Sequence, residues 1–453
     1  MDGSLKTPWG DTEELRSLHL PRGRGRSSGP DEWRRQKRRK LFGGLVEALA
    51  GKPYAELTIS DLAEVSGVDR NDFYRAFPGG KRDFLLDAVE RLYRHAEEVA
   101  VDAYGREEDW EAGVRAGWEA IVKAICSQPD AARMGIVEVY AAGPAGAELV
   151  DDALVRFERL LSRSLALSER RAGMPAEIVA AVVSGMQMVL HDRLRRGGRG
   201  AVRKVSGELI DWALSYETPP LPLKEGAAAR WRRHCPPCEG ADERIVRAVA
   251  EISADPALSL TAERIAGKAR ISLSTLYKHC ERGTEDAFLM AFDTICRRAF
   301  AVCFDAYQGD EGWPLKMHAV NHPLFSYLAS EPGFAKTVLV DVLGAGAEAL
   351  KHRHEALEPF RQLLGEGYTL NPRAPEVADE AIVYAVYSLA GRRVAREGAG
   401  ALPSLAPTAT YLELAPFVGA GRAAQIADSA PRRAAARRDG AAVPTPAAGW
   451  VSD

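Results

Sequence analysis

The chain of 453 residues has little cysteine and no long apolar run, and both absences narrow what it can be. Six cysteines are too few for a disulfide scaffold. No apolar stretch approaches the roughly 18 residues that argue for a membrane-spanning helix. The first residues, MDGSLKTPWGDTEEL, hold no apolar core of a signal peptide. We therefore expect a cytoplasmic protein with no place in a membrane.

Signatures of catalysis are also missing. The chain has no Walker loop, no G-x-S-x-G and no H-E-x-x-H. His318 and His322 have a spacing that zinc ligands on a helix share, but Pro323 follows at once and no carboxylate lies between them. Cys235 and Cys238 form one C-x-x-C, more typical of reduced thiols in a linker than of a redox or metal sensor. We expect no enzyme, no cofactor and no metal site.

The net charge of −3 does not mark the whole chain as a nucleic-acid binder, so the distribution of charge matters more. Nine basic residues lie between positions 22 and 40, opposed there by Asp31 and Glu32. They are Arg22, Arg24, Arg26, Arg34, Arg35, Lys37, Arg38, Arg39 and Lys40. Taken alone, this block fits a solvated tail or an arm that follows DNA phosphates.

The chain repeats itself over long distances. The segment LTISDLAE from Leu57 resembles LTAERIAG from Leu260, 203 residues later. FERLL at 157–161 recurs as FRQLL at 360–364 with the same offset, and 183–196 resembles 383–396 at an offset of 200. A unit of roughly 190 residues is domain-sized, so two copies predict tandem domains rather than a solenoid.

Composition shifts and the repeat place the domain boundaries. Gly, Pro, Ser and Arg dominate the first 30 residues, prolines interrupt 218–240, and the end is rich in Ala, Arg and Pro. The expected parts are a disordered basic arm at 1–30, a first unit divided into 31–95 and 96–217, a linker at 218–240, a second unit divided into 241–299 and 300–420, and a disordered tail at 421–453.

Apolar residues recur with helical spacing in both copies. Leu41, Phe42, Leu45, Val46 and Leu49 share one helix face. Ile245, Val246, Val249 and Ile252 do the same in the second copy, and no stretch alternates convincingly as a strand would. The fold class is therefore predicted to be all-α.

Two short helices across a tight turn are expected inside the first copy. Thr58 can cap a helix with Asp61 as its capping-box partner, and Gly67 accepts the positive φ that a turn needs. Val68 would fill the angle between the helices, and Asp69 would cap the second helix, from about 70 to 77. This is the arrangement of a helix-turn-helix, whose second helix enters the major groove.

The second helix offers side chains that suit DNA. Arg pairs with guanine and Asn with adenine, while hydroxyls, Lys and a helix N-terminus suit phosphates. Residues expected to face bases are Arg70, Asn71, Asp72 and Arg75, and those expected to face phosphates are Thr58, Tyr74 and Lys81.

The strings LTISDLAEVSGVDRNDFYRAFPGGKRDFL and LSLTAERIAGKARISLSTLYKHCERGTEDAFL resemble the DNA-binding signature of the tetracycline-repressor (TetR) family. The helical remainders, ending near MQMVLHDRLRRG and AVYSLAGRRVAREG, are similar to the family's C-terminal region, so the resemblance spans most of 34–420. The resemblance implies a three-helix head and a helical-bundle body in each unit. The heads would be a helix-turn-helix DNA-binding domain at 31–95 and a second, divergent helix-turn-helix domain at 241–299. The first body, for ligand binding and dimerisation, would be 96–217, and the second helical body 300–420. The resemblance also implies a repressor that binds a double-stranded DNA operator and is released by a small-molecule effector, here unknown. In the second copy it implies DNA contacts at Thr261, Ser272, Leu273, Ser274, Thr275, Tyr277 and Lys278.

The second copy departs from this pattern. Arg270 stands where the first copy has the turn glycine, Cys280 replaces the aromatic Phe77, and Thr284 replaces Lys81. We expect the second copy to bind DNA less well or to serve as a pseudo-partner.

Family members pair two heads on DNA, so the chain is expected to form an intramolecular pseudo-dimer or a homodimer. The effector pocket is expected among large side chains of the bodies, for which core packing is the alternative reading. These are Trp118, Met134, Tyr140, Met186, Tyr327, Tyr384 and Tyr387. The alternative function is a ligand-binding or protein-interaction module that has lost DNA binding.

Overall fold

The computed structural model describes residues 30–52, 54–223, 240–255 and 257–429. Every regular element in these residues is helical, which confirms the all-α fold class. The chain divides into two compact units, Met1–Leu214 (unit 1) and Ser215–Asp453 (unit 2). Most of the expected basic arm, linker and C-terminal tail lies outside the described residues.

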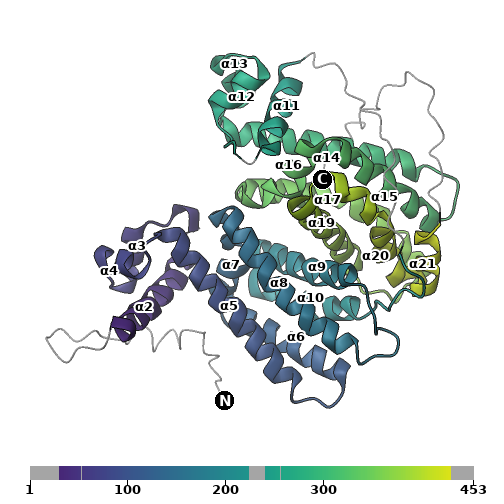
Figure 1. Cartoon of the computed structure of the whole chain (residues 1–453), viewed down its shortest axis with the longest axis horizontal. Helices are drawn as coiled ribbons and strands as arrows, with labels where there is room; N and C mark the ends of the chain where they lie inside the picture. The colour runs from purple at the N-terminus through teal and green to yellow at the C-terminus, as the bar shows by residue number, and fades with distance from the viewer. Residues whose placement is uncertain (1–29, 53, 224–239, 256, 430–453) are drawn as a thin grey trace. The chain divides into compact units, whose positions relative to one another are not determined.

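Unit 1 begins with a small group of helices at the N-terminal end of a long one (Figure 1). We call α2–α4 with the first turns of α5 head 1, and α6–α10 with the rest of α5 body 1. The elements are α2 (Pro30–Gly51), η1 (Tyr54–Glu56), α3 (Ile59–Ser66), α4 (Arg70–Ala76), α5 (Lys81–Tyr104), α6 (Trp110–Ser127), α7 (Pro129–Ile136), η2 (Glu138–Ala142), α8 (Pro144–Leu165), α9 (Ala176–Arg196) and α10 (Gly198–Ala213).

Head 1 is built around an aromatic cluster. Phe42 of α2 stacks on Phe84 of α5 with ring centroids 5.4 Å apart. Phe73 of α4 meets Phe84 edge-on at 5.5 Å, and Phe77 lies 4.9 Å from the same ring. All four rings are buried, and each pair adds about 0.5–1.5 kcal/mol beyond its buried area. The cluster therefore ties the recognition segment to both flanking helices.

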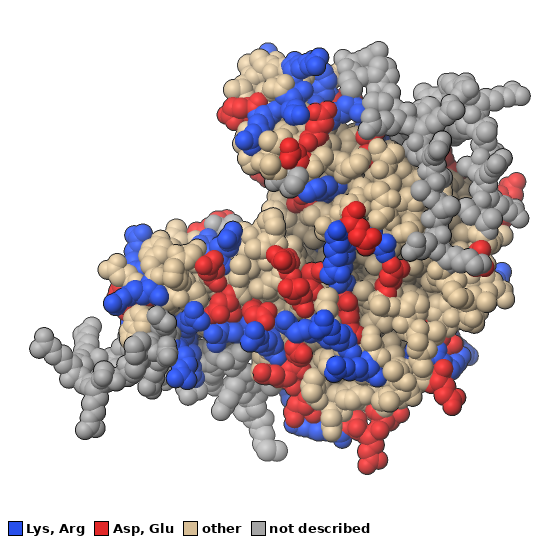
Figure 2. Space-filling model, viewed as in Figure 1, with Lys and Arg blue, Asp and Glu red and all other residues tan. Residues whose placement is uncertain are grey.

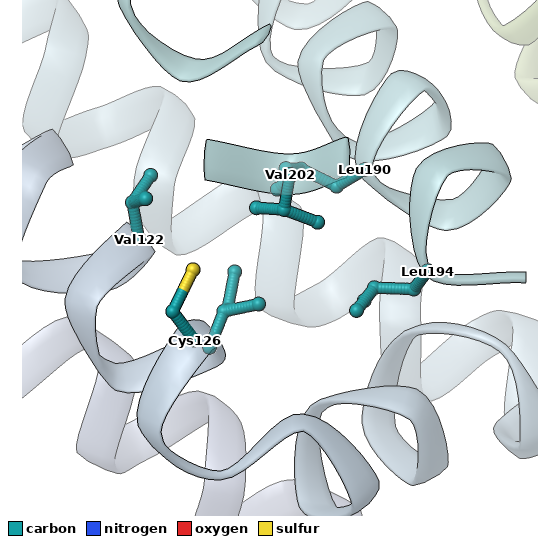
Figure 3. Close-up of a cluster of buried hydrophobic side chains, with 6 residues drawn as sticks. Val122, Cys126, Leu190, Leu194 and Val202 are labelled. Carbon is teal, nitrogen blue, oxygen red and sulfur yellow. The ribbon is translucent and has the colours of Figure 1, made fainter. Parts of the chain in front are cut away.

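Body 1 has an aliphatic core where α6 faces α9 and α10. Val122 and Cys126 of α6 pack with Leu190 and Leu194 of α9 and with Val202 of α10 (Figure 3). The helical period places these side chains on single faces, as expected for helices buried on one side.

Unit 2 has a similar order of elements, without a counterpart of η1 among its described residues and with additional elements after α17. α11–α13 with the first turns of α14 form head 2, and the later helices with the rest of α14 form body 2 (Figure 1). The elements are α11 (Ala241–Ala254), α12 (Ala262–Ala269), α13 (Leu273–His279), α14 (Thr284–Tyr307), α15 (Trp313–Ser330), α16 (Pro332–Leu339), η3 (Asp341–Gly344), α17 (Ala347–Leu364), α18 (Gly367–Leu370), α19 (Ala378–Glu397), η4 (Ala399–Leu405), α20 (Ala406–Val418) and α21 (Ala420–Ala427).

Helix starts in the two units keep the spacing of the sequence repeat. Each of α3, α4, α5, α6, α7 and α8 begins 203 residues before α12, α13, α14, α15, α16 and α17, respectively. Two successive series of six helices with one constant offset are what an internal duplication would produce.

Three expected boundaries need correction. Residue 95 does not separate head from body, because α5 runs without a break from Lys81 to Tyr104. Residue 299 likewise falls inside α14. The tail does not become loose at 421, because α21 is a helix whose Ala423 and Ala424 are fully buried. Small side chains let this helix pack closely, a signal that an Ala-rich composition hides.

Candidate nucleic-acid interface and cavities

The first helix of the helix-turn-helix, α3, starts with the predicted capping box. The Asp61 amide donates to Thr58 Oγ1 at 3.1 Å, and the Thr58 amide donates to Asp61 Oδ2 at 2.6 Å. Lys52 also donates to Asp61 Oδ2, at 2.7 Å. The Lys52 and Thr58 hydrogen bonds hold the pKa of Asp61 down at about 2. The Thr58 hydroxyl itself donates to Asp61 at 2.8 Å, so it already serves the cap.

The turn between α3 and α4 has the predicted geometry. Gly67 adopts the left-handed conformation, with φ 62° and ψ 24°. Val68 is buried between the two helices, and the Asp69 side chain caps α4 by accepting from the Asp72 amide at 2.9 Å. That bond from Asp72 contributes most to lowering the pKa of Asp69. The sequence therefore determined the local backbone through residues whose preferences are strong.

The outer face of α4 carries cationic and polar side chains. Arg70, Asn71, Tyr74 and Arg75 are exposed, and we call these four residues the reading face. The Arg75 side chain is 73% exposed and the Tyr74 residue 45%. Phe73 and Ala76 are buried on the opposite side of the helix. The amphipathic pattern thus presents this face to solvent, where a DNA groove would be met.

Asp72 differs from its expected outward position. Its side chain is only 16% exposed and forms an ion pair with Lys37 of α2, at 2.5 Å. Trp33, one turn earlier on α2, has the Arg75 guanidinium 5.6 Å from its ring centroid and the Lys37 ammonium at 5.9 Å. Sequence reasoning missed this link, although Trp33 and Lys37 are a helical turn apart and so share a face. Asp72 therefore positions α4 against α2.

The Lys81 side chain is less exposed than that of a phosphate-binding lysine on an open surface would be. Its ammonium donates to the Leu57 carbonyl at 2.6 Å and lies 4.2 Å from the ring centroid of Tyr54. Burial lowers the pKa of Lys81, with the nearby Asp61 charge opposing that shift. The lysine therefore joins the start of α5 to the segment before α3.

Head 2 keeps the same backbone with different residues. The Thr261 hydroxyl accepts from the Arg264 amide at 3.3 Å, and Ser272 caps α13 by accepting from the Thr275 amide at 3.0 Å. Ser272 therefore corresponds in role to Asp69 rather than to a base-reading residue. Arg270 occupies the left-handed turn position with φ 53° and ψ 48°, as its alignment with Gly67 predicts.

The exposed face of α13 is less suited to reading bases. Leu273 is 41% exposed and Tyr277 49%, and Ser274 and Lys278 are exposed beside them. Thr275 is half-buried, and its hydroxyl lies 2.8 Å from that of Ser272. This face carries one cation where the reading face of α4 carries two arginines.

Charges of both signs surround the two heads. On the side drawn in Figure 2, Lys and Arg atoms lie over both helix-turn-helix segments, with Asp and Glu atoms beside them. Neither head is uniformly basic on this side.

Body 1 encloses a cavity of about 480 Å³. Leu92, Tyr93 and Ala96 of α5 line it, together with mostly apolar residues of α6, α8 and α9. This volume falls within the roughly 300–1,000 Å³ that is typical of small-molecule sites. The cavity is large enough for an organic ligand, and one of its walls is the helix that also forms head 1.

A second, smaller cavity of about 100 Å³ lies in body 2. Its lining includes the buried Asn321 and Glu413, which sequence reasoning did not single out. Three of the expected pocket residues line a cavity: Trp118 and Met186 in body 1, and Tyr387 in body 2.

The other expected pocket residues lie outside both linings. Met134 is fully buried in α7, and the Tyr140 hydroxyl accepts from Gln187 Nε2 at 3.4 Å. Tyr384 is also buried, with its hydroxyl 3.0 Å from His354 Nδ1, and Tyr327 is partly buried on α15. Core packing was the alternative reading for such residues, and it describes these four.

Comparison with known proteins gives a distant, partial similarity. No protein-family model matches the chain. The chain is similar to the HTH-type transcriptional regulator EthR of Mycobacterium tuberculosis and of Mycobacterium bovis, with 31% identity over 139 residues. The match covers 28% of this chain and 61% of each relative, so the chain spans about three fifths of the length of the curated relatives it matches. This similarity relates part of the chain to a helix-turn-helix regulator.

None of the helices in the described part of the chain is both long and apolar enough to span a bilayer. Within the same residues, no three His, Cys, Asp or Glu side chains gather as a group that could hold a metal ion.

Proposed function

We propose that the chain is a sequence-specific DNA-binding transcription regulator of the TetR type, with α4 of head 1 as the recognition helix. The exposed reading face of α4 (Arg70, Asn71, Tyr74 and Arg75), held between a capped helix and a buried aromatic cluster, carries this proposal. The similarity to an HTH-type transcriptional regulator supports it.

The side chains of head 1 divide into two roles. Arg70, Asn71 and Arg75 read base edges in the major groove, because Arg and Asn make bidentate contacts there. Tyr74 contacts a phosphate through its hydroxyl. Lys81 has three N–H donors, so it can keep its bond to Leu57 and still donate to a phosphate.

We further propose a repressor whose effector binds in the cavity of body 1. The lining is mostly apolar, so the effector is a predominantly apolar small molecule. Because α5 contributes to both the cavity and head 1, a ligand that prefers one position of α5 changes the population of DNA-competent heads. The size of that change is limited by the ligand's differential affinity for the two states.

The constant offset between helix starts leads us to propose that the two units are tandem TetR-like copies. In that case the chain can act as an intramolecular pseudo-dimer, with its two heads on successive major grooves about 34–36 Å apart. Native mass spectrometry of the DNA complex tests this: one chain per operator supports the pseudo-dimer, and only two-chain complexes would contradict it.

The weaker reading face of α13 favours one alternative function. Leu273 and Ser274 occupy the positions of Arg70 and Asn71, and neither makes a strong bidentate base contact. The alternative is a ligand-binding or protein-interaction module that has lost DNA binding.

One binding experiment separates the two functions. The full chain is titrated with DNA from its own upstream region and with a genomic DNA library across a salt series. A regulator selects particular sequences. The logarithm of its binding constant falls linearly with the logarithm of the salt concentration, with a slope of about −0.9 per phosphate contact. The Arg70→Ala, Tyr74→Ala double variant should lose sequence selectivity, and its binding constant should depend less steeply on salt. Absence of selective binding at low salt would favour the interaction module.

A further inference from the structure

The cavity of body 2 is small, and its mostly apolar lining includes a buried polar pair. Its volume of about 100 Å³ is less than the roughly 150 Å³ of an apolar cavity that accommodates benzene. It therefore has room for about three water molecules or for a ligand of about four to six heavy atoms. Asn321 of α15 and Glu413 of α20 meet at its wall.

Asn321 carries a buried acceptor with no partner in the part of the chain that the structure describes. The residue is 1% exposed, and its Nδ2 donates to Glu413 Oε2 at 2.6 Å and to Thr410 Oγ1 at 3.2 Å. The Thr410 hydroxyl donates to the Ala406 carbonyl at 2.9 Å, so its oxygen accepts, and this fixes the orientation of the amide. Asn321 Oδ1 then remains without a hydrogen bond.

Glu413 is a buried acid without a countercharge. The residue is 7% exposed and forms no ion pair with another described residue, and its hydrogen-bonding partner is Asn321. Burial raises the pKa of Glu413 to about 8, and the Asn321 bond opposes that rise. The acid is thus mostly neutral at neutral pH, as expected for an unpaired buried carboxyl group. One oxygen accepts from Asn321, and in the neutral acid the other oxygen can carry the proton and donate it.

The position in unit 1 that matches Asn321 is aromatic. Trp118 of α6 lies 203 residues before Asn321 of α15, within the series of helices that keeps this offset, and it lines the cavity of body 1. The same helical position therefore carries an indole in the large, mostly apolar cavity of one unit and a side-chain amide in the small cavity of the other.

We propose that the cavity of body 2 is a second ligand site, which binds a small neutral molecule with a hydrogen-bond donor and an acceptor on neighbouring atoms, as in a primary amide. The ligand N–H donates to Asn321 Oδ1, and its carbonyl accepts from the Glu413 hydroxyl. Apolar side chains such as Phe325 and Leu328 enclose the rest of the ligand. This site does not depend on DNA binding.

Other titratable groups also lie around the cavity. Burial raises the pKa of Cys296, Cys303 and Tyr387, which favours their neutral forms, and burial lowers the pKa of His318 beside Thr410, which favours its neutral imidazole. Arg353 also lines the cavity, with its guanidinium 5.8 Å from the ring centroid of Tyr384. Glu413 is then the group whose titration changes ligand binding between about pH 6 and pH 9.

Calorimetry and ligand-observed NMR on the full chain without DNA test the site, with acetamide and propionamide as probes. Methylammonium and acetate are the comparison probes. We expect amide binding that is constant near pH 6 and weakens up to tenfold per pH unit above about pH 8, because ionised Glu413 no longer donates. Glu413→Gln keeps a donor and should retain amide binding within about threefold while removing the pH dependence. Asn321→Leu should weaken amide binding by roughly 5- to 150-fold, since a lost hydrogen bond costs about 1–3 kcal/mol.

Gln362→Leu is the matched control, because it removes an exposed side-chain amide in the same unit and should leave probe binding unchanged. Glu413→Gln keeps the test decisive even if Asn321→Leu does not fold. Methylammonium binding that strengthens as pH rises, and is lost in Glu413→Gln, would overturn the proposal. A weak specific ligand would have a Kd in the millimolar range. If neither amide probe binds at concentrations up to about 100 mM, the cavity holds water only, and this would also overturn the proposal.

Discussion

Heads 1 and 2 have nearly the same backbone but carry different outer surfaces. Both begin the first short helix with a capping threonine, Thr58 or Thr261, and both turn through a left-handed residue, Gly67 or Arg270. Their second helices both run for seven residues, yet the reading face of α4 is replaced on α13 by Leu273, Ser274, Tyr277 and Lys278. Caps and buried residues thus maintain the helix-turn-helix, whereas the outer face can change without altering it.

The largest expected difference between the heads lies in their cores. Phe73 contacts the rings of Phe77 and Phe84, whereas the matched Leu276 has no ring to stack and meets Cys280 in place of Phe77. Phe73→Ala should cost head 1 about 3–5 kcal/mol, and Leu276→Ala should cost head 2 about 2–4 kcal/mol. Native-state hydrogen exchange of the full chain measures each head separately. A larger loss in head 2 would contradict the role given to the aromatic cluster.

The next largest effect concerns DNA affinity. Arg75→Ala should weaken binding to the selected sequence by roughly 5- to 150-fold, since a bidentate base contact is worth about 1–3 kcal/mol. Lys278→Ala, the matched change in head 2, should weaken it by less than about threefold if that residue meets only a phosphate. Fluorescence anisotropy at a fixed salt concentration compares the DNA affinities of the two variants. Equal losses would mean that both heads read bases, and no loss in either would remove head 1 from the proposed interface.

A smaller effect on stability, opposite in sign in the two heads, is expected at the turn residues. A Cβ atom at Gly67 would meet no atom within 4 Å, so Gly67→Arg costs only the left-handed strain. We expect Gly67→Arg to destabilise head 1 by about 0.5–1 kcal/mol, and Arg270→Gly to stabilise head 2 by a similar amount. Hydrogen exchange in the two variants measures both changes. A stabilising effect of Gly67→Arg would show that left-handed strain is not the controlling factor.

The smallest expected effect is on how the stability of head 1 depends on pH. Asp61 has a pKa of about 2 in the folded chain, below its usual value near 4, so its stabilising effect is complete above about pH 4. That effect is lost as the pH falls towards about 2. Head 2 has Arg264 at the matched position, so this source of acid sensitivity applies to head 1 alone. Acid titration of Asp61→Asn, followed by hydrogen exchange in head 1, should show a flatter profile than the parent chain.

Local features were the ones that could be predicted from the sequence. Thr58, Gly67 and Asp69 act through their own backbone neighbourhood, so their positions alone indicated the caps and the turn. Helical spacing likewise indicated which residues of α2 and α11 are buried. The all-α class followed from the same short-range signals.

Long-range contacts could not be predicted in the same way. Asp72 turns inward because Lys37, on another helix, is its partner, and Lys81 does so because of Leu57 and Tyr54. Helical periodicity cannot distinguish a side chain in a packed core from one that lines a cavity, so large aromatic residues were poor guides to the cavities. Glu413 did leave a signal, since it is an acid inside the apolar run YLELAPF.

The lengths of α5 and α14 have a consequence for where the two units can accept inserted residues. Both helices contain 24 residues, although their sequences differ at most positions. Each residue added to a helix turns everything beyond it by about 100° and advances it by about 1.5 Å. An insertion in a loop would leave head and cavity in register, but a single insertion within α5 would point its head in a new direction. Rotational phase, rather than residue identity, is therefore the property that α5 and α14 share.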